Sequence, residues 1–149
     1  MNKALNSLEK VSVLHTNYIG NLGYVLHNQN FITPITYFYN EEKHNITCHL
    51  HNKDKINALR KKNPISLYVS DINSFDHRES VLIKGTYKEH NGSGAKAILH
   101  EFSLGIKKII INEKQKDLDF MNQFSDKSYA NDIPVIFTIE IEEITGKCS

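Results

Sequence analysis

The sequence predicts a mainly β protein, a small barrel of six strands with a few helices at its periphery. Six segments carry the alternating pattern, or the β-branched and aromatic composition, that is typical of strands. The segments with helical spacing are fewer, and they do not stand between every pair of strands as they do in a doubly wound sheet. We therefore expect a barrel rather than a layered α/β fold.

The length and the composition indicate one folded domain. A chain of 149 residues has the usual size of a single domain and can bury roughly two-thirds of the surface that it exposes when unfolded. Hydrophobic residues make up 40% of the chain and charged residues 23%, which are ordinary values for a globular protein. Because the sequence contains no internal repeat, low-complexity segment or linker, we expect one domain over residues 1–149.

The charges of the chain nearly cancel, which limits the classes of partner. Lysine and arginine together number 18, and aspartate and glutamate number 17, so no overall field attracts nucleic acid or an anionic membrane. No apolar run reaches the roughly 18 residues that span a bilayer. We therefore expect neither a nucleic-acid partner nor a membrane partner, and any anion site must be local.

The cysteines and the first residues indicate a compartment. The chain has two cysteines, Cys48 in an expected strand and Cys148 near the end, which excludes the disulfide-rich secreted class. Residues 1–6 lack the apolar stretch of a signal peptide. A cytoplasmic location is therefore the expectation.

A short helix is expected at the start of the chain, where Leu5, Leu8 and Val11 recur at helical spacing behind Asn2, a candidate cap. A β-hairpin follows it. The remaining expected elements are, in order, a strand over 46–50, a helix over 54–62, strands over 65–69 and 81–87, a turn at Gly92 and Gly94, helices over 97–104 and 115–124, and a strand over 135–142.

The expected hairpin has strands over 19–26 and 31–39 and a turn over 27–30. Both faces of its second strand are apolar or aromatic, so this strand requires cover on both sides, by the barrel interior and by a partner subunit or a ligand. Pro34 cannot donate a backbone hydrogen bond, which favours an edge or a bulge and a split in the barrel at this point. We therefore expect a split barrel that forms a homodimer.

Three neighbouring segments carry a more specific pattern. They are the extended run over 34–39, the short strand over 47–50, and a cationic helical segment over 53–64. This succession resembles the pyridoxamine 5'-phosphate oxidase-like FMN-binding split barrel family, in the branch of the Nim-type nitroimidazole-resistance flavoproteins. Two later segments, 80–85 and 141–147, are similar to the same pattern, so the resemblance covers most of the chain.

The resemblance implies an FMN cofactor at a homodimer interface. One strand would lie along the isoalloxazine and ribityl chain with a second strand beside it, a lysine at the helix start would reach the phosphate, and a strand of the second subunit would complete the site. A phosphate needs a fixed cation and hydrogen-bond donors, which such a helix start supplies together. The strand along the cofactor matches Pro34, Ile35, Thr36 and Tyr37, and the strand beside it matches Thr47, Cys48 and His49. The lysine at the phosphate matches Lys53 or Lys55, and the strand of the second subunit matches Ser80 and Val81.

The residues at the helix start leave an alternative open. Lys55 is the first candidate for the phosphate and Lys53 the second. Asp54 lies between them and would repel a phosphate if it pointed inward, whereas an acidic residue in the first turn also suits the helix dipole. The other interpretation is therefore an ordinary solvated helix start with both lysines in water.

Other chemistry has less support. His49 and His51 project from one strand face, so haem is an alternative cofactor, but the sequence lacks the second ligand pair of a structural zinc site and no metal is expected. Segment 92–96 fails the spacing of a phosphate-binding loop, and no nucleophile motif is present. The sequence identifies no catalytic residue.

These features favour an FMN-dependent oxidoreductase that reduces small electron-poor substrates, with the flavin at the subunit interface. Two alternatives stay open. One is a non-enzymatic flavin- or haem-binding protein for storage or sensing, and the other is a split-barrel dimer that has lost its cofactor. An absorption spectrum would discriminate among them.

Overall fold

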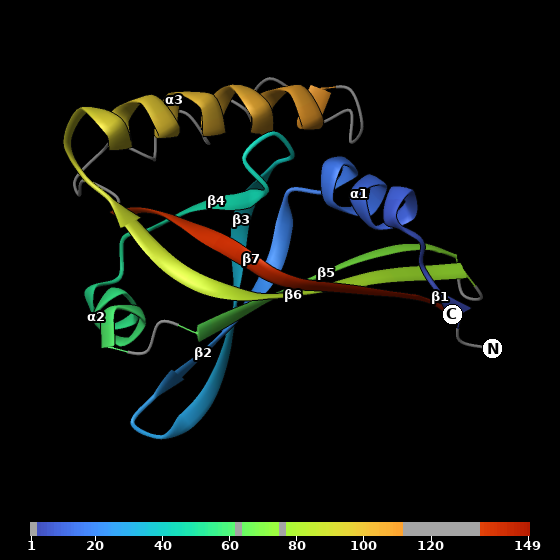
Figure 1. Cartoon of the computed structure of the whole chain (residues 1–149), viewed down its shortest axis with the longest axis horizontal. Coiled ribbons are helices and arrows are strands. Elements are labelled where there is room, and N and C mark those ends of the chain that lie inside the picture. The colour runs from blue at the N-terminus through green and yellow to red at the C-terminus, as the bar shows by residue number, and fades with distance from the viewer. Residues whose placement is uncertain (1–2, 62–63, 75–76, 112–134) are drawn as a thin grey trace.

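The computed structural model describes residues 3–61, 64–74, 77–111 and 135–149. Within them the chain forms a mainly β fold, with three helices around a ring of six strands (Figure 1). The strands of the ring are, in chain order, β2 (Ile19–Leu26), β3 (Gln29–Asn40), β4 (Asn45–Leu50), β5 (Pro64–Ser74), β6 (His77–His90) and β7 (Val135–Cys148). The prediction of a six-stranded barrel is confirmed.

All neighbouring strands of the ring are antiparallel. Their order is β7-β4-β3-β2-β5-β6, and the pairing of β6 with β7 closes the ring. A two-residue strand, β1 (Lys3–Ala4), pairs with the end of β7, so the first and the last described residues lie on the same side of the molecule (Figure 1). The strands β5, β6 and β7 are longer than the sequence pattern indicated, because β6 pairs with β5 and β7 along almost its whole length.

The predicted hairpin of β2 and β3 is confirmed, but its turn is shorter than the expected span. Leu26 pairs with Gln29, so the turn consists of His27 and Asn28 alone. Their φ angles are 52° and 61°, the left-handed region in which asparagine is enriched. Two residues of this conformation match the right-handed twist of the flanking strands, which is why such turns join strands of a hairpin.

The sequence predicted Asn2 as the cap of the first helix, and this prediction is wrong. The helix α1 (Ser7–Thr16) is capped by Asn6. Asn6 Oδ1 accepts a hydrogen bond from Glu9 N at 2.9 Å, and Glu9 Oε1 accepts one from Asn6 N at 3.0 Å. This reciprocal pair is a capping box. The helix packs on the barrel core through Leu14, whose carbonyl oxygen accepts a hydrogen bond from the Tyr37 hydroxyl at 2.9 Å.

The other two helices pack in different ways: α2 adds Ala58 and Leu59 to the main core, whereas α3 covers part of the outer face of the ring (Figure 1). The helix α2 (Lys53–Lys61) follows β4 directly, and α3 (Gly92–Ile109) follows β6 and packs on β3, β4 and β7. Phe102 and Ile106 of α3 are buried in a second hydrophobic cluster that Phe38 joins from β3. The barrel interior therefore holds the main core, and α3 adds a smaller one on the outer face.

The two glycines that the sequence assigned to a turn lie where the chain enters α3, and Gly92 keeps a left-handed conformation that is typical of turns. Gly92 has a φ of 66°, and Gly94 lies within the helix. The apolar face of α3 packs over the sheet further along, at Phe102 and Ile106, and this packing supports the helix although Gly94 has a low helix propensity. The expected helix over 97–104 is the middle of this longer one, and the expected helix over 115–124 lies outside the described residues.

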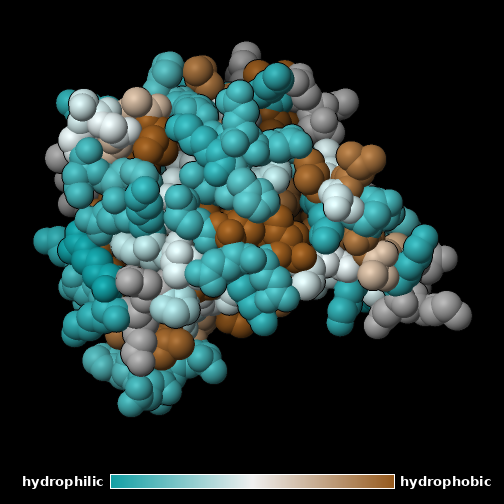
Figure 2. Space-filling view, viewed as in Figure 1, coloured by the Kyte–Doolittle hydropathy of each residue, from teal (hydrophilic) through white to brown (hydrophobic). Residues whose placement is uncertain are grey.

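The face of the molecule in Figure 2 is mixed in character. Figure 2 shows a mostly hydrophilic face with apolar surface near its centre. In the described part of the chain, no helix is both long and apolar enough to cross a membrane. The cytoplasmic location stays a prediction.

The contact between α3 and β3 can be tested at Gly105. A Cβ at this position would overlap the ring of Phe38, so Gly105→Ala should lower the free energy of unfolding by about 1–3 kcal/mol. Gly94→Ala in the same helix is the control, because its Cβ would meet nothing within 4 Å. The control should be neutral or stabilising by up to about 1 kcal/mol. Urea unfolding measures both values, and equal effects would contradict the close packing of α3.

Candidate functional site

The pairing of β3 with β4 forms the base of the candidate site. Tyr37 pairs with Cys48, and Phe38 pairs with Thr47. Because side chains alternate across a sheet, the predicted site residues fall into two sets. Ile35, Tyr37 and Cys48 point into the barrel and are buried, whereas Pro34, Thr36, Thr47 and His49 point outward. A ligand on the outside would contact the side chains of the second set and only the backbone of the first.

The inward side chains take part in the core and not in a binding site. The Tyr37 hydroxyl donates its hydrogen bond to Leu14, and the Cys48 thiol is fully buried. Burial raises the pKa of Tyr37 and the pKa of Cys48 well above their ordinary values. Both groups therefore stay protonated at neutral pH, and neither serves as an acid, a base or a nucleophile for a ligand.

The start of α2 brings a lysine onto β3. Asn52 caps the helix, since its Oδ1 accepts a hydrogen bond from Lys55 N at 3.0 Å. The Lys55 ammonium reaches across to β3, where Nζ donates to Thr33 Oγ1 at 3.0 Å. Lys53 and Asp54 are exposed in the same turn. Of the two predicted lysines, Lys55 is therefore the one that contacts β3. Thr33 has the same alternation as the buried Ile35, so this contact lies on the side of β3 that faces the core.

His49 stands on the outer face of β4 with a neutral ring. Burial, and secondarily the charge of His51, lower the pKa of His49 to about 4. Its ring packs edge-on against Phe102 of α3, with ring centres 5.2 Å apart. Nδ1 is buried and has no hydrogen-bond partner among the described residues. The described part of the chain also contains no group of three metal-ligating side chains that could hold a metal ion. The Nδ1 atom of His49 therefore has no assigned partner, either polar or metallic, among the described residues.

Ser80 and Val81 lie apart from the other predicted site residues within one chain. They belong to β6, where they pair with Ser70 and Val69 of β5. The strands β5 and β2 separate them from β3, and the Val81 side chain is fully buried in the core. A single chain therefore does not bring them to Lys55, and their predicted role depends on a second copy.

The sequence predicted an apolar outer face on β3, but not its extension over β2 and β5. Ile32 is 75% exposed, Ile72 67% and Tyr68 43%. Asn21 of β2 pairs with both Pro34 and Tyr68, so these strands present one continuous outer face. An antiparallel sheet that faces water usually carries polar residues on that side. This face is therefore a candidate contact surface.

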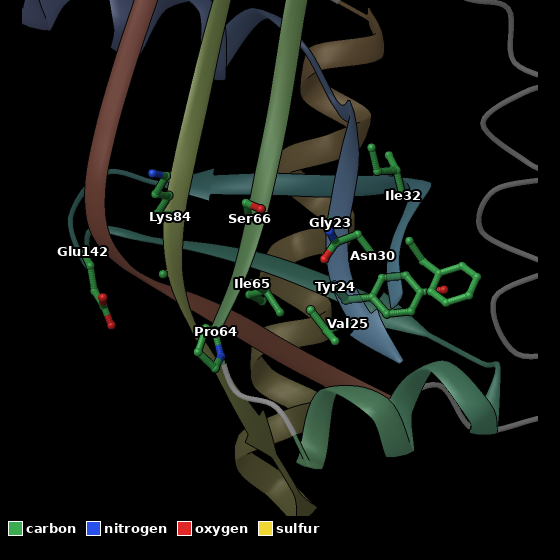
Figure 3. Close-up of a pocket in the computed structure, with 12 residues that line it drawn as sticks. Gly23, Tyr24, Val25, Asn30, Ile32, Pro64, Ile65, Ser66, Lys84 and Glu142 are labelled. Atoms are coloured by element: carbon green, nitrogen blue, oxygen red, sulfur yellow. The ribbon is translucent and has the colours of Figure 1, made fainter. Parts of the chain in front are cut away.

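A groove of about 500 Å³ crosses this outer face. Gly23 forms its floor, because it pairs with Ile32 on one side and Ser66 on the other and has no side chain of its own. Figure 3 shows Lys84, Ser66, Gly23 and Ile32 in succession across neighbouring strands. The sequence signal was the glycine inside a strand pattern, which marks a close approach or an open space.

The fold is similar to those of several solved proteins. An FAD-binding protein from Mesorhizobium loti has a TM-score of 0.74 at 21% identity, over 100% of this chain and 99% of that one. A candidate pyridoxamine 5'-phosphate oxidase from Corynebacterium glutamicum has a TM-score of 0.69 at 13% identity, over 100% of this chain and 98% of that one. A candidate 5-nitroimidazole antibiotic resistance protein from Bacteroides thetaiotaomicron has a TM-score of 0.69 at 16% identity, over 99% of this chain and 87% of that one.

These similarities show the fold of the chain. No protein-family model matches the sequence, and no curated protein matches it significantly. The predicted resemblance to split-barrel proteins of the pyridoxamine oxidase and nitroimidazole-resistance kind is confirmed at the level of the fold. The roles of the individual site residues stay predictions.

The burial of His49 makes the stability of the protein depend on pH. Its folded pKa of about 4 lies below the ordinary value of 6.5, so between these values the unfolded chain binds more protons than the folded chain. The stabilisation from the neutral ring is complete above the unfolded pKa and is lost as the pH falls toward 4. The loss from this residue is on the order of 2–3 kcal/mol.

Urea unfolding at about pH 7 and about pH 5 measures this dependence. His49→Gln should reduce the loss of stability at the lower pH, because the glutamine does not titrate. His51→Gln is the control, since His51 is exposed. This variant should still show most of the loss of stability at the lower pH. A pH dependence that His49→Gln leaves unchanged would show that the ring is not held neutral.

Proposed function

We propose that the protein binds FMN with its phosphate at the start of α2, beside Lys55, and with its ring on the outer face of β3 and β4. The observation that carries the proposal is the hydrogen bond from Lys55 Nζ to Thr33 Oγ1 at 3.0 Å. It holds the ammonium of a capped helix start beside the strand that continues into Pro34. The fold adds support, because similar folds include a protein described as FAD-binding.

The start of α2 offers the donors that a phosphate requires. The first N–H groups of a helix have no partner within the helix. Asn52 accepts from Lys55 N through its side chain and from Ile56 N through its carbonyl oxygen, which leaves the N–H groups of Lys53 and Asp54 for a ligand. The helix dipole and the Lys55 ammonium both favour an anion here. The exposed Asp54 carboxylate is screened by water and salt.

The flavin ring would lie along the outer face of β3 and β4, beside Thr36 and His49. The pyrimidine edge of a flavin carries both hydrogen-bond donors and acceptors. His49 Nδ1 is a buried nitrogen without a partner among the described residues, and a hydrogen bond to that edge would satisfy it. Tyr37 and Cys48 would contribute through their backbone groups. The residues present therefore fit a flavin.

We propose further that the protein is an oxidoreductase acting on small electron-poor substrates. The flavin supplies the electron transfer, after reduction by a reductant such as a nicotinamide nucleotide. The chain holds the ring and controls what approaches it. With its lowered pKa, His49 adds no charge beside the ring at neutral pH, and the buried Cys48 thiol adds no nucleophile.

A second copy of the chain would complete the site. The outer face with Ile32, Tyr68 and Ile72 lies uncovered in one chain, and apolar surface of this kind commonly marks an interface. Ser80 and Val81, which the resemblance assigns to the second subunit, would then come from the partner. The proposed assembly is a homodimer with two equivalent flavin sites.

Replacement of Lys55 tests the phosphate site. A hydrogen bond between a charged donor and a phosphate contributes on the order of 1.5–3 kcal/mol, so Lys55→Ala should weaken FMN binding about 10- to 100-fold. Riboflavin has the same ring but no phosphate, so its affinity should not change. Quenching of flavin fluorescence measures both dissociation constants, and FAD titrated in parallel decides between the two flavin nucleotides.

Lys53→Ala is the matched control for Lys55→Ala, because Lys53 is exposed in the same helical turn. It should leave the FMN affinity within about twofold of the original. If both variants bind FMN as the original does, the phosphate is held elsewhere. If the original protein does not bind FMN even when FMN is supplied well above micromolar concentration, the flavin proposal is wrong. A Soret band in the absorption spectrum would indicate haem instead.

The dimer can be tested at Ile32. The original protein should have a mass of about 34 kDa in solution, twice that of the 17.1 kDa chain. Ile32→Glu should give monomers, because burial of an unpaired carboxylate is strongly unfavourable. Leu8→Glu changes a residue of α1 that is 82% exposed and should leave the dimer intact. Light scattering distinguishes the two masses, and a monomeric original protein would contradict the shared site.

A further inference from the structure

A cavity of about 340 Å³ lies between α3 and the outer face of the sheet. The register builds its floor, because Asn40 pairs with Asn45 and Asn45 pairs with Glu140. These three polar side chains therefore stand in a row across β3, β4 and β7. Ile98 and Glu101 of α3 form the opposite wall, and Asn40 Nδ2 donates a hydrogen bond to Glu101 Oε1 at 2.7 Å.

Two buried oxygens at this cavity have no hydrogen-bond partner among the described residues. They are Asn45 Oδ1 and Glu140 Oε2. Asn45 is only 8% exposed, so its side chain has little contact with bulk water. Because the two residues are cross-strand partners, their Cβ atoms lie about 4.5–5.5 Å apart. A group with several N–H donors and a positive charge could bind both oxygens at once, and an ammonium group has this form.

Positive charges stand elsewhere around the same cavity. Lys43, from the turn between β3 and β4, and Lys88 of β6 both line it. In the described part of the chain neither lysine forms an ion pair with Glu140. Their charge acts on His90, whose pKa is lowered mainly by burial and further by Lys88 and Lys43, with Glu140 opposing. The cavity therefore presents acceptors for a cation and donors for an anion.

The size and lining of the cavity fit a small polar molecule. At about 30 Å³ for each liquid water, its volume corresponds to roughly ten waters, more than one or two structural waters occupy. Ile98 is the one apolar side chain among the described residues that line it. A divalent metal ion suits the site poorly, because these residues include no group of three metal-ligating side chains and the two lysines would repel it.

We propose that this cavity binds a small zwitterion, a free α-amino acid with a polar side chain. Its ammonium group would meet Asn45 Oδ1 and Glu140 Oε2, and its carboxylate would meet Lys43 and Lys88. Threonine hydroxyls and the ring of His90 also line the cavity and would serve the polar side chain of the ligand.

The zwitterion site does not depend on the proposed flavin site. Lys55, Thr33 and His49 do not line the cavity, and Thr47 is the single residue predicted for the flavin that does. The cavity lies at the Asn45 end of β4, whereas α2 follows the other end of the strand, which is roughly 17 Å away at the usual rise per residue. Either proposal can therefore fail without the other.

Titration calorimetry with L-glutamine tests the proposal on the full chain. L-glutamine should bind, whereas N-acetyl-L-glutamine, which lacks the ammonium group, and L-glutaminamide, which lacks the carboxylate, should each bind at least about tenfold more weakly. The proposal is overturned if L-glutamine does not bind at millimolar concentration or if either analogue binds equally well. Competition between L-glutamine and FMN would assign the cavity to the flavin site and would also overturn it.

Two variants locate the binding. Glu140→Gln keeps the shape of the side chain but removes its charge, so it should weaken L-glutamine binding about 10- to 100-fold without lowering the melting temperature. Glu142→Gln is the matched control, because Glu142 is exposed on the same strand and lines the other groove. It should leave the affinity unchanged. Equal affinities of the two variants for L-glutamine would place the ligand outside this cavity.

Discussion

The alternation of side chains along β3, β4 and β7 is the constraint on which both proposed sites depend. Tyr37, Cys48 and Phe137 are neighbours in the register and are all fully buried in the barrel. A shift of one residue would expose these side chains and bury their polar neighbours, and the loss of apolar burial opposes it. With the inner row fixed, His49 and Asn45 have to face the outside.

The local elements could be predicted from the sequence where one pattern dominates, and were mistaken where two patterns compete. The six strands follow from composition and alternation, which act within a few residues. The cap of α1 was assigned to Asn2, although the spacing of Asn6 and Glu9 carries the stronger signal of a capping box. Gly92 and Gly94 indicated a turn, and Gly92 does have a turn-type φ, but the helix that includes Gly94 is held by the packing of Phe102 and Ile106 further along α3.

The candidate sites were predictable to the extent that they are contiguous in the sequence. The chain passes directly from β4 into α2, so the position of Lys55 near the strands could be expected. The direction of Tyr37 could not, because both faces of β3 are apolar and the pattern does not say which face is inside. The row of Asn45 and Glu140 depends on the pairing of two strands far apart in the sequence, which no local pattern contains.

The outer face beneath α3 combines two kinds of contact whose energies oppose each other. Phe102 and Ile106 are buried there, and full burial of such side chains contributes about 1.5–3 kcal/mol each. Asn45 and Glu140 lie against the same helix with unpaired oxygens, each of which costs about 1–3 kcal/mol. An apolar pair at these two positions would remove that cost and extend the packing. Stability alone therefore does not account for the polar row, whereas an interaction made only when the cavity is filled does.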